Sequence, residues 1–203
     1  MVDAVADSGD NARWLSQWLL RTPELPLLTG SPMGRSGFNM VAGTDGADRL
    51  YAEHGKDNVL YGGEGRDTLF AGTGRDILYG DGPRSSAATE HRDTFVFESV
   101  DVLHKTMKKT DVIVDFDRLD RIDLSGLTGP KLEFIGKARF SDDGDGEVRF
   151  KAVKDKGYAV LQIKYVNPDI IDPVTQVNVK VLAEAPAMSM GNLYQTIAHS
   201  LIL

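Results

Sequence analysis

The first 42 residues carry the hydrophobic spacing of a helix. Trp14 and Trp18, each followed by a leucine, stand four residues apart and therefore share one helical face. Asp10 precedes this pattern and is a residue type that caps helix N-termini, while Pro23 cannot continue a helix. The pattern predicts a short N-terminal helix and a linker within residues 1–42.

From Gly43 onward the hydrophobic positions instead recur with a period of nine or ten residues. Four segments fit the pattern Gly-x-Asp-x-apolar. A nine-residue period is too short for a repeated helix pair, and it fits a parallel β-roll, in which a six-residue turn alternates with a three-residue strand. The apolar residue two places after an Asp then points into the roll as core, as predicted for Leu50, Leu69 and Leu78. The predicted roll covers residues 43–92.

One step of this series is longer than the others. Gly55 and Gly65 are ten residues apart, whereas the neighbouring glycines of the series step by nine. Val59 and Leu60 stand where a single apolar residue is expected. The extra residue predicts a β-bulge in this strand.

Residues 93–184 alternate between apolar and other residues, as strands do. Phe95 and Phe97 are separated by one residue, and so are Val112 and Val114. This segment predicts further β-strands. The last segment, 185–203, contains no Asp, Glu, Lys or Arg and ends in three aliphatic residues.

Composition narrows the classes of function. The chain has 203 residues and a formal net charge of −7, which disfavours nucleic acid as a partner because phosphate binding needs a basic surface. Cysteine is absent, so disulfides and thiolate metal sites are excluded. No apolar run is long enough to span a membrane, and we expect no stable membrane insertion. The N-terminus lacks the basic start and apolar run of a conventional signal peptide.

The repeat combines the two oxygen donors that calcium prefers, carboxylates and backbone carbonyls freed by glycine turns. Successive turns lie on opposite edges of a roll, so we expect ions to pair Asp48 with Asp67 and Asp57 with Asp76. The alternative is that these are solvated turns. Acids outnumber bases in the repeats, and without metal their repulsion should unfold the roll. The candidate metal ligands are Asp45, Asp48, Asp57, Asp67, Asp76, Asp81 and Asp93, with Gly43, Gly46, Gly55, Gly62, Gly63, Gly65, Gly72 and Gly74.

Residues 62–70 match every defined position of the nonapeptide Gly-Gly-x-Gly-x-Asp-x-apolar-x, and three strand signatures follow at residues 93–97, 111–116 and 120–125. This succession resembles the repeats-in-toxin (RTX) proteins, in particular the C-terminal domain of serralysin proteases and the R-modules of mannuronan epimerases. The resemblance covers about residues 43–165. It implies an all-β fold, with a calcium-filled parallel β-roll followed by an antiparallel β-sandwich over residues 93–184. It also implies a secreted, extracellular protein that type I secretion machinery exports.

Two segments depart from the family pattern, 83–92 within the last repeat and 165–174 near the closing strands. The charge-free tail 185–203 is similar to a type I export signal. Its alternative interpretation is a packed terminal helix with Leu193, Ile197 and Leu201 on one face.

No catalytic residues are predicted. His-Glu-x-x-His and Gly-x-Ser-x-Gly are absent, and the four histidines are scattered. The acids Asp115, Asp117, Asp120 and Asp123 are attributed to turns or to one further cation. We therefore expect any catalysis in another module. Two further interpretations stay open, a serralysin relative lacking its catalytic domain and a module that binds an anionic polysaccharide. For the second, the candidate cations are Lys105, Lys108, Lys109, Arg118, Arg121, Lys131, Lys137, Arg139, Lys151, Lys154 and Lys156.

Overall fold

The computed structural model describes nine segments: residues 2–3, 38–81, 91–99, 109–127, 131–141, 146–153, 158–166, 174–183 and 189–203. The helix predicted around Trp14 and Trp18 lies outside these residues. The strands are β1 (Val2–Asp3), β2 (Phe38–Ala42), β3 (Asp48–Tyr51), β4 (Asp57–Tyr61), β5 (Thr68–Phe70), β6 (Asp76–Tyr79), β7 (Thr94–Val96), β8 (Asp111–Phe116), β9 (Arg121–Asp123), β10 (Glu133–Phe134), β11 (Glu147–Val153), β12 (Tyr158–Val166), β13 (Val174–Ala183) and β14 (Leu201–Ile202). The helix α2 covers Met190–Ser200.

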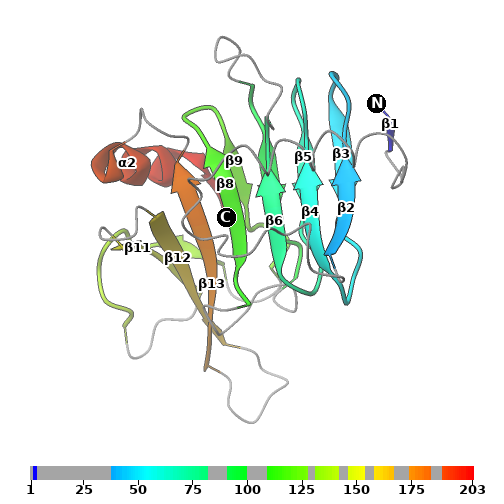
Figure 1. Cartoon of the computed structure of the whole chain (residues 1–203). Helices are drawn as coiled ribbons and strands as arrows, with labels where there is room; N and C mark the ends of the chain where they lie inside the picture. The colour runs from blue at the N-terminus through cyan, green and yellow to red at the C-terminus, as the bar shows by residue number, and fades with distance from the viewer. Residues whose placement is uncertain are drawn as a thin grey trace.

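Consecutive strands of the repeat region alternate between two sheets. Sheet A has the order β1-β3-β5-β7-β9-β14, and the roll strands of sheet B have the order β8-β6-β4-β2. All of these neighbours pair in parallel. Figure 1 shows the roll strands β2, β4, β6 and β8 side by side, pointing in one direction. The predicted parallel β-roll is confirmed.

The core of the roll is a row of side chains between the two sheets. Side chains alternate along a strand, so each roll strand turns an apolar residue inward between two residues that point outward. The inward residues are fully buried: Leu50, Leu60, Leu69, Leu78, Phe95, Ile113 and Ile122. The three predicted core leucines are therefore confirmed, and Leu60 is the core residue of the second repeat.

The outer faces of the two sheets differ in character. On sheet A, Tyr51 is 48% exposed and its ring stacks on Phe70 with 4.4 Å between centroids. On sheet B, Val59, Tyr61, Ile77 and Tyr79 form a second, buried hydrophobic cluster. The rings of Tyr61 and Tyr79 stack with 4.5 Å between their centroids. The outward side chains of β4 and β6 are therefore buried, like the inward ones.

The antiparallel part of the fold continues sheet B. Strand β12 pairs antiparallel with β11 on one side and with β13 on the other, and β13 pairs in parallel with β8 of the roll. The eight-stranded sheet thus runs from the roll into the antiparallel strands without an interruption of backbone pairing. Strands and one short helix make the described fold nearly all-β, as predicted.

The C-terminal tail packs as a helix and a short strand. The hydroxyl oxygen of Ser189 accepts the Asn192 N–H at 3.2 Å and caps α2. Leu193 and Ile197 of α2 are fully buried in the core, and β14 pairs in parallel with β9. The packed-helix interpretation of the tail is confirmed for these two residues, while its role in export stays a prediction. No helix in the described ranges is long and apolar enough to cross a membrane.

Candidate calcium sites

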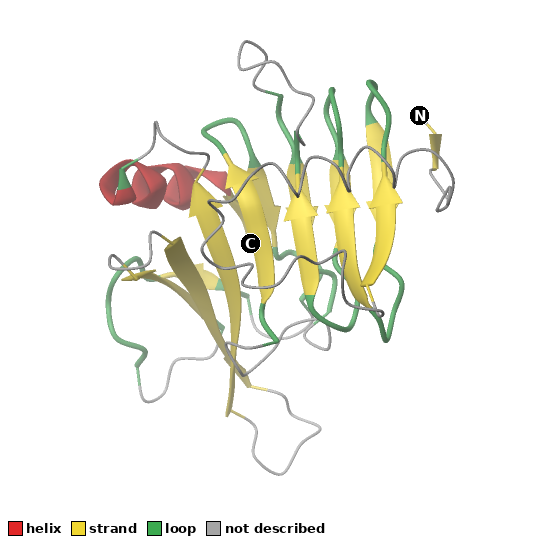
Figure 2. Ribbon diagram, viewed as in Figure 1, coloured by secondary structure: helices red, strands yellow, loops and turns green. Residues whose placement is uncertain are grey.

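The alternation between sheets places the turns on two edges of the roll, seen as two rows in Figure 2. Asp48, Asp67, Asp93 and Asp120 lie on the upper edge, named from its place in Figure 1, each at the start of a strand of sheet A or directly before it. Asn58, Asp76 and Asp111 lie on the lower edge, each in the first two residues of a strand of sheet B. One coil of the roll is a strand of sheet B followed by a strand of sheet A, beginning with β2 and β3. Each edge carries a ladder of polar side chains, one for each coil.

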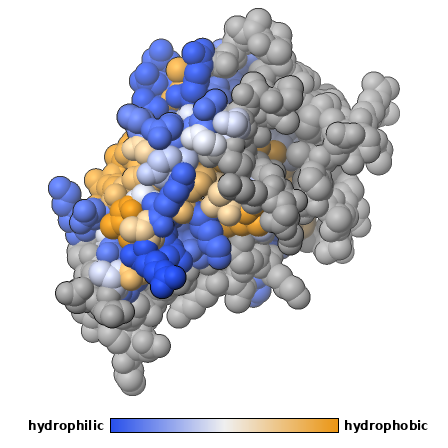
Figure 3. Space-filling view, turned by 90° about the vertical axis from the view of Figure 1, so that its left-hand side faces the viewer, coloured by the Kyte–Doolittle hydropathy of each residue, from blue (hydrophilic) through white to orange (hydrophobic). Residues whose placement is uncertain are grey.

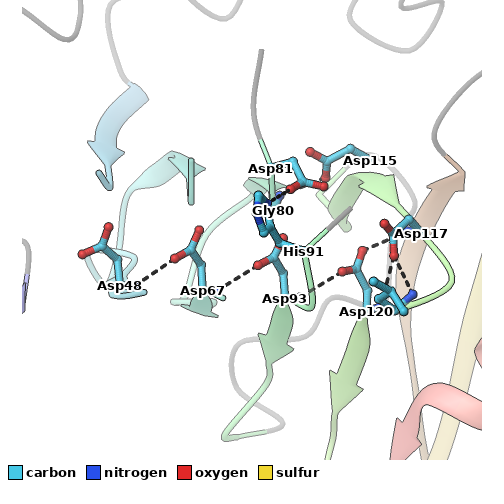
Figure 4. A network of polar contacts seen from close by, with 10 residues as sticks. Asp48, Asp67, Gly80, Asp81, His91, Asp93, Asp115, Asp117 and Asp120 are labelled. Carbon is cyan, nitrogen blue, oxygen red and sulfur yellow. Dashed lines mark hydrogen bonds and ion pairs between the residues drawn. The ribbon is translucent and has the colours of Figure 1, made fainter. Parts of the chain in front are cut away.

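The upper ladder is joined by hydrogen bonds from backbone to carboxylate (Figure 4). The Oδ1 atom of Asp67 accepts the Asp48 N–H at 2.9 Å, and Oδ1 of Asp93 accepts the Asp67 N–H at 2.9 Å. Oδ1 of Asp120 continues the series by accepting the Asp93 N–H at 3.0 Å. These four carboxylates therefore stand in one line, at the same position of successive coils, and all four are buried.

Two carboxylate oxygens of this ladder lack a hydrogen bond. Oδ2 of Asp67 and Oδ2 of Asp93 are buried and have no hydrogen-bond partner among the described residues. Burial raises the pKa of Asp67 to about 7 and that of Asp93 to about 8, and neighbouring acids add to the rise. A buried carboxylate without a partner is costly, so the ladder needs a proton or a cation.

Glycines bring backbone carbonyls beside these carboxylates. A Cβ at Gly62 would lie 2.2 Å from the carbonyl oxygen of Gly80 and 2.4 Å from Oδ2 of Asp67. One coil earlier, a Cβ at Gly43 would lie 2.2 Å from the Gly62 carbonyl oxygen and 2.8 Å from Oδ2 of Asp48. Only glycine permits this approach, and it gathers carboxylate and carbonyl oxygens of adjacent coils at one point.

The next glycine along the upper edge also lies against a carboxylate. A Cβ at Gly80 would lie 2.3 Å from Oδ2 of Asp93. Asp81 follows it in the chain, is buried, and contacts the imidazole of His91 at 3.1 Å. Acidic oxygens therefore accumulate where the third and fourth coils meet, as Figure 4 shows for Asp81, Asp93 and Asp115.

The oxygen set fits a hard divalent cation. Calcium takes six to eight oxygen ligands, among them carboxylates and backbone carbonyls. No group of three or more His, Cys, Asp or Glu side chains converges on one point within the described segments. A site on the upper edge would therefore draw several of its ligands from the backbone carbonyls of the turns, which is the donor type that the glycines expose.

The lower edge differs from the expected pairing. The register of β4 and β6 sets Asn58, and not Asp57, opposite Asp76. Asp57 is exposed, and its Oδ1 accepts the Arg75 N–H at 2.9 Å. The expected pairing of Asp57 with Asp76 is wrong, because Leu60 must point into the core and Asn58 stands two residues before it.

The predicted bulge at Val59 and Leu60 is also wrong. Strand β4 pairs with β2 and with β6 without a shift in register. Val59 points outward into the second hydrophobic cluster, and Leu60 points inward. The extra residue of the ten-residue step therefore lies in the turn between Ala52 and Asn58, where a longer loop is tolerated.

The remaining predicted ligands differ in their exposure and backbone conformation. Asp45, Gly46 and Gly55 are exposed, whereas Asp76 is buried and its Oδ2 accepts the Gly72 N–H at 2.7 Å. Three glycines take positive φ and lie against the turn of the preceding coil: Gly63 at 112°, Gly65 at 118° and Gly74 at 130°.

Three residues of the ladders were not among the predicted ligands. These are Asn58, Asp111 and Asp120, of which Asp111 accepts the Asp76 N–H at 2.8 Å. Asp120 was expected only to serve a turn or one further cation outside the repeats. Their signal was present in the strand residues. Counting back two places from each inward apolar residue leads to all three.

The geometry agrees with the comparison with protein-family models. Residues 33–60 and 55–82 match the model described as "RTX calcium-binding nonapeptide repeat (4 copies)". These residues form RTX repeats, which bind Ca²⁺. A second model, described as "RebB: Killing trait", matches residues 170–203. Comparison with curated proteins gives no match.

The solved structures that this chain resembles include R-modules. The solution structure of the AlgE6R3 subunit from the Azotobacter vinelandii mannuronan C5-epimerase is 24% identical, with a TM-score of 0.54, over 86% of this chain and 83% of that one. The AlgE6R2 subunit of the same epimerase is 22% identical, with a TM-score of 0.45, over 85% of this chain and 95% of that one. The likeness to the AlgE6R3 subunit shows that the RTX repeats here are built into a fold of the R-module type.

Proposed function

We propose that this chain is a secreted calcium-binding RTX module whose roll becomes compact when ions bind the upper edge. The observation that carries the proposal is the pair of buried oxygens, Oδ2 of Asp67 and Oδ2 of Asp93, beside the carbonyls of the glycine turns. The module acts as a structural, secretion or binding unit, and any catalysis lies in another module or chain.

Calcium binding and folding are coupled because the ions neutralise a buried row of acids. Extracellular modules bind calcium with dissociation constants of about 10⁻⁴ to 10⁻³ M, so cytosolic calcium leaves them empty and millimolar calcium fills them. Each site filled to ten times its dissociation constant stabilises the fold by about 1.4 kcal/mol. Several sites together approach the stability of a whole small domain, which is about 5 kcal/mol at its lower limit.

A calcium titration tests this proposal. We expect the purified chain to gain β-structure by circular dichroism as calcium rises into the millimolar range, with bound ions measured by equilibrium dialysis at the same points. Magnesium at the same concentration serves as the control, since it demands a tighter octahedral shell. Unchanged spectra together with no bound calcium would refute the proposal.

The proposed route out of the producing cell is type I export through the C-terminal tail. Its support is the charge-free sequence of residues 185–203 and the similarity of the repeats to RTX proteins. The test is secretion from cells that carry a type I exporter, comparing the full chain with one whose residues 185–203 are replaced by an unrelated helix. Equal secretion of both chains would contradict this route. Ile197→Ala, which disturbs packing and keeps the tail, separates loss of the signal from loss of folding.

A second candidate function is binding of an anionic polysaccharide, favoured by cations on the antiparallel end of the molecule. Lys137 Nζ lies 4.0 Å from the ring centroid of Tyr194, and the Arg149 guanidinium carbon lies 4.3 Å from that of Phe140. Lys131, Arg139 and Lys151 are exposed on the same strands and their connections. Figure 3, seen from the side of α2, shows hydrophobic residues at mid-height on this face, with hydrophilic residues above, below and between them.

Retention on an alginate column tests the second candidate. We expect the calcium-loaded chain to be retained at low salt and eluted at high salt, because screened charge contacts weaken with ionic strength. Lys137→Ala and Lys151→Ala should shorten retention, and Arg66→Ala, an exposed cation of the roll outside the candidate set, is the matched control. Passage of the wild-type chain without retention at low salt would exclude this function.

A further inference from the structure

Asn58 occupies the ladder position that an aspartate holds in the neighbouring coils. It is fully buried, and β4 pairs it directly with Asp76 of the next coil on the lower edge. An amide differs from a carboxylate in one respect that matters here: its nitrogen donates hydrogen bonds, whereas both carboxylate oxygens only accept them.

The amide nitrogen of Asn58 is surrounded by three oxygen atoms. It donates to the carbonyl oxygen of Lys56 at 2.8 Å, to that of Glu53 at 3.1 Å and to Oδ1 of Asp76 at 2.7 Å. Backbone carbonyls and carboxylates are oxygen types that calcium takes as ligands, and the three oxygens here would be part of a shell of six to eight. Calcium lies 2.3 to 2.6 Å from its oxygen ligands, so an amide nitrogen at these distances stands close to where an ion would be.

We propose that the Asn58 amide replaces a calcium ion in the turn formed by residues 53–57. This inference rests on the proposed calcium-binding function. It means that hydrogen bonds hold one turn of the roll in place without a metal ion. The amide N–H groups of Asn58 carry partial positive charge and donate hydrogen bonds to the same oxygens that a cation would bind. The turn therefore needs no ion, and calcium binding is directed to other turns of the roll.

The other contacts of this turn agree with closure without metal. The side-chain oxygen of Asn58 accepts the Glu53 N–H at 3.0 Å, so the amide is bound to the turn through both of its ends. Lys56 forms an ion pair with Glu53 at 2.8 Å, and the Gly55 N–H donates to the hydroxyl oxygen of Thr73 at 2.7 Å. At other places in the ladders, in contrast, Oδ2 of Asp67 on the upper edge and Oδ2 of Asp111 on the lower edge have no hydrogen-bond partner in the described part of the chain.

The substitution Asn58→Asp tests the inference by restoring a carboxylate. We expect the variant to bind one more calcium ion than the wild-type chain, measured by equilibrium dialysis at saturating calcium. The double variant Asp57→Asn with Asn58→Asp keeps the net charge and exchanges two neighbouring residues, so it separates the position of the carboxylate from the total charge. It should also gain one ion. Asn58→Ala should gain none, because it removes the amide and adds no ligand.

If Asn58→Asp fails to fold, a high-resolution structure of the calcium-loaded wild-type chain tests the inference. We expect ions on the upper edge and none among Glu53 O, Lys56 O and Asp76. An ion there would overturn the inference, as would equal stoichiometry in the wild-type chain and a folded Asn58→Asp variant. These outcomes differ from failure of the proposed function, in which the wild-type chain binds no calcium at all.

Discussion

The close approach at Gly62 gives a prediction whose size follows from the structure. In Gly62→Ala, the new methyl group would lie 2.2 Å from the Gly80 carbonyl oxygen and 2.4 Å from Oδ2 of Asp67. Both distances are far inside van der Waals contact. The Gly80 carbonyl cannot rotate away, because it accepts the Gly63 N–H at 3.0 Å, so adjacent coils must separate.

Overpacking of this kind costs about 1 to 3 kcal/mol. The rigid neighbour at Gly62 places the expected loss near the upper limit, about 2 to 3 kcal/mol after the small gain from restricting the unfolded chain. For a chain of this length, 1 kcal/mol corresponds to about 2 to 4 °C in the unfolding midpoint. We therefore expect Gly62→Ala to lower the midpoint by about 4 to 12 °C in millimolar calcium.

The matched control is Gly46→Ala, in the preceding turn of the same edge. Gly46 is exposed, and the nearest atom to a Cβ there is the Thr44 hydroxyl oxygen at 3.6 Å, an ordinary contact. This variant should change stability by less than about 1 kcal/mol. Thermal unfolding of both variants by circular dichroism, with and without calcium, gives the comparison. Equal midpoints for the two variants would refute the packing argument for the upper edge.

Three further predictions address charge, pH and the tail. Asp67→Asn keeps an oxygen that can accept the Asp48 N–H and removes the negative charge. In chelator it should therefore raise the midpoint of thermal unfolding. By calorimetry it should weaken calcium binding about tenfold, on the order of 1.4 kcal/mol. Without metal, the pKa values of about 7 for Asp67 and about 8 for Asp93 mean that the fold holds protons that the unfolded chain releases near pH 4. Stability in chelator should be complete below that pH and fall as the pH rises through 7 to 8; a midpoint that rises over this range would contradict the assignment. Leu193→Ala removes a fully buried side chain of α2 and should cost about 2 to 5 kcal/mol in denaturant unfolding; a change below 1 kcal/mol would mean that the tail is not part of the core.

The register of the repeats shows where sequence reasoning reached its limit. Counting forward from Gly55 leads to Asp57, whereas counting back from the inward Leu60 leads to Asn58, and the structure follows the second count. Burial of the leucine decides the register, because a slip by one residue would turn every side chain of β4 to the opposite face. The glycine position is free to vary, since a turn can absorb one extra residue.

The sequence by itself determined the parallel roll, its inward leucines and the row of acids on glycine turns, because these depend on a local period that repeats along the chain. Only the tertiary structure decided which polar residue enters each ladder, that Asp111 and Asp120 extend the ladders, and that β13 joins the antiparallel strands to β8. Those features depend on pairing between residues far apart in the chain. Such pairing is set by the burial of whole strands, which no single segment of the sequence encodes.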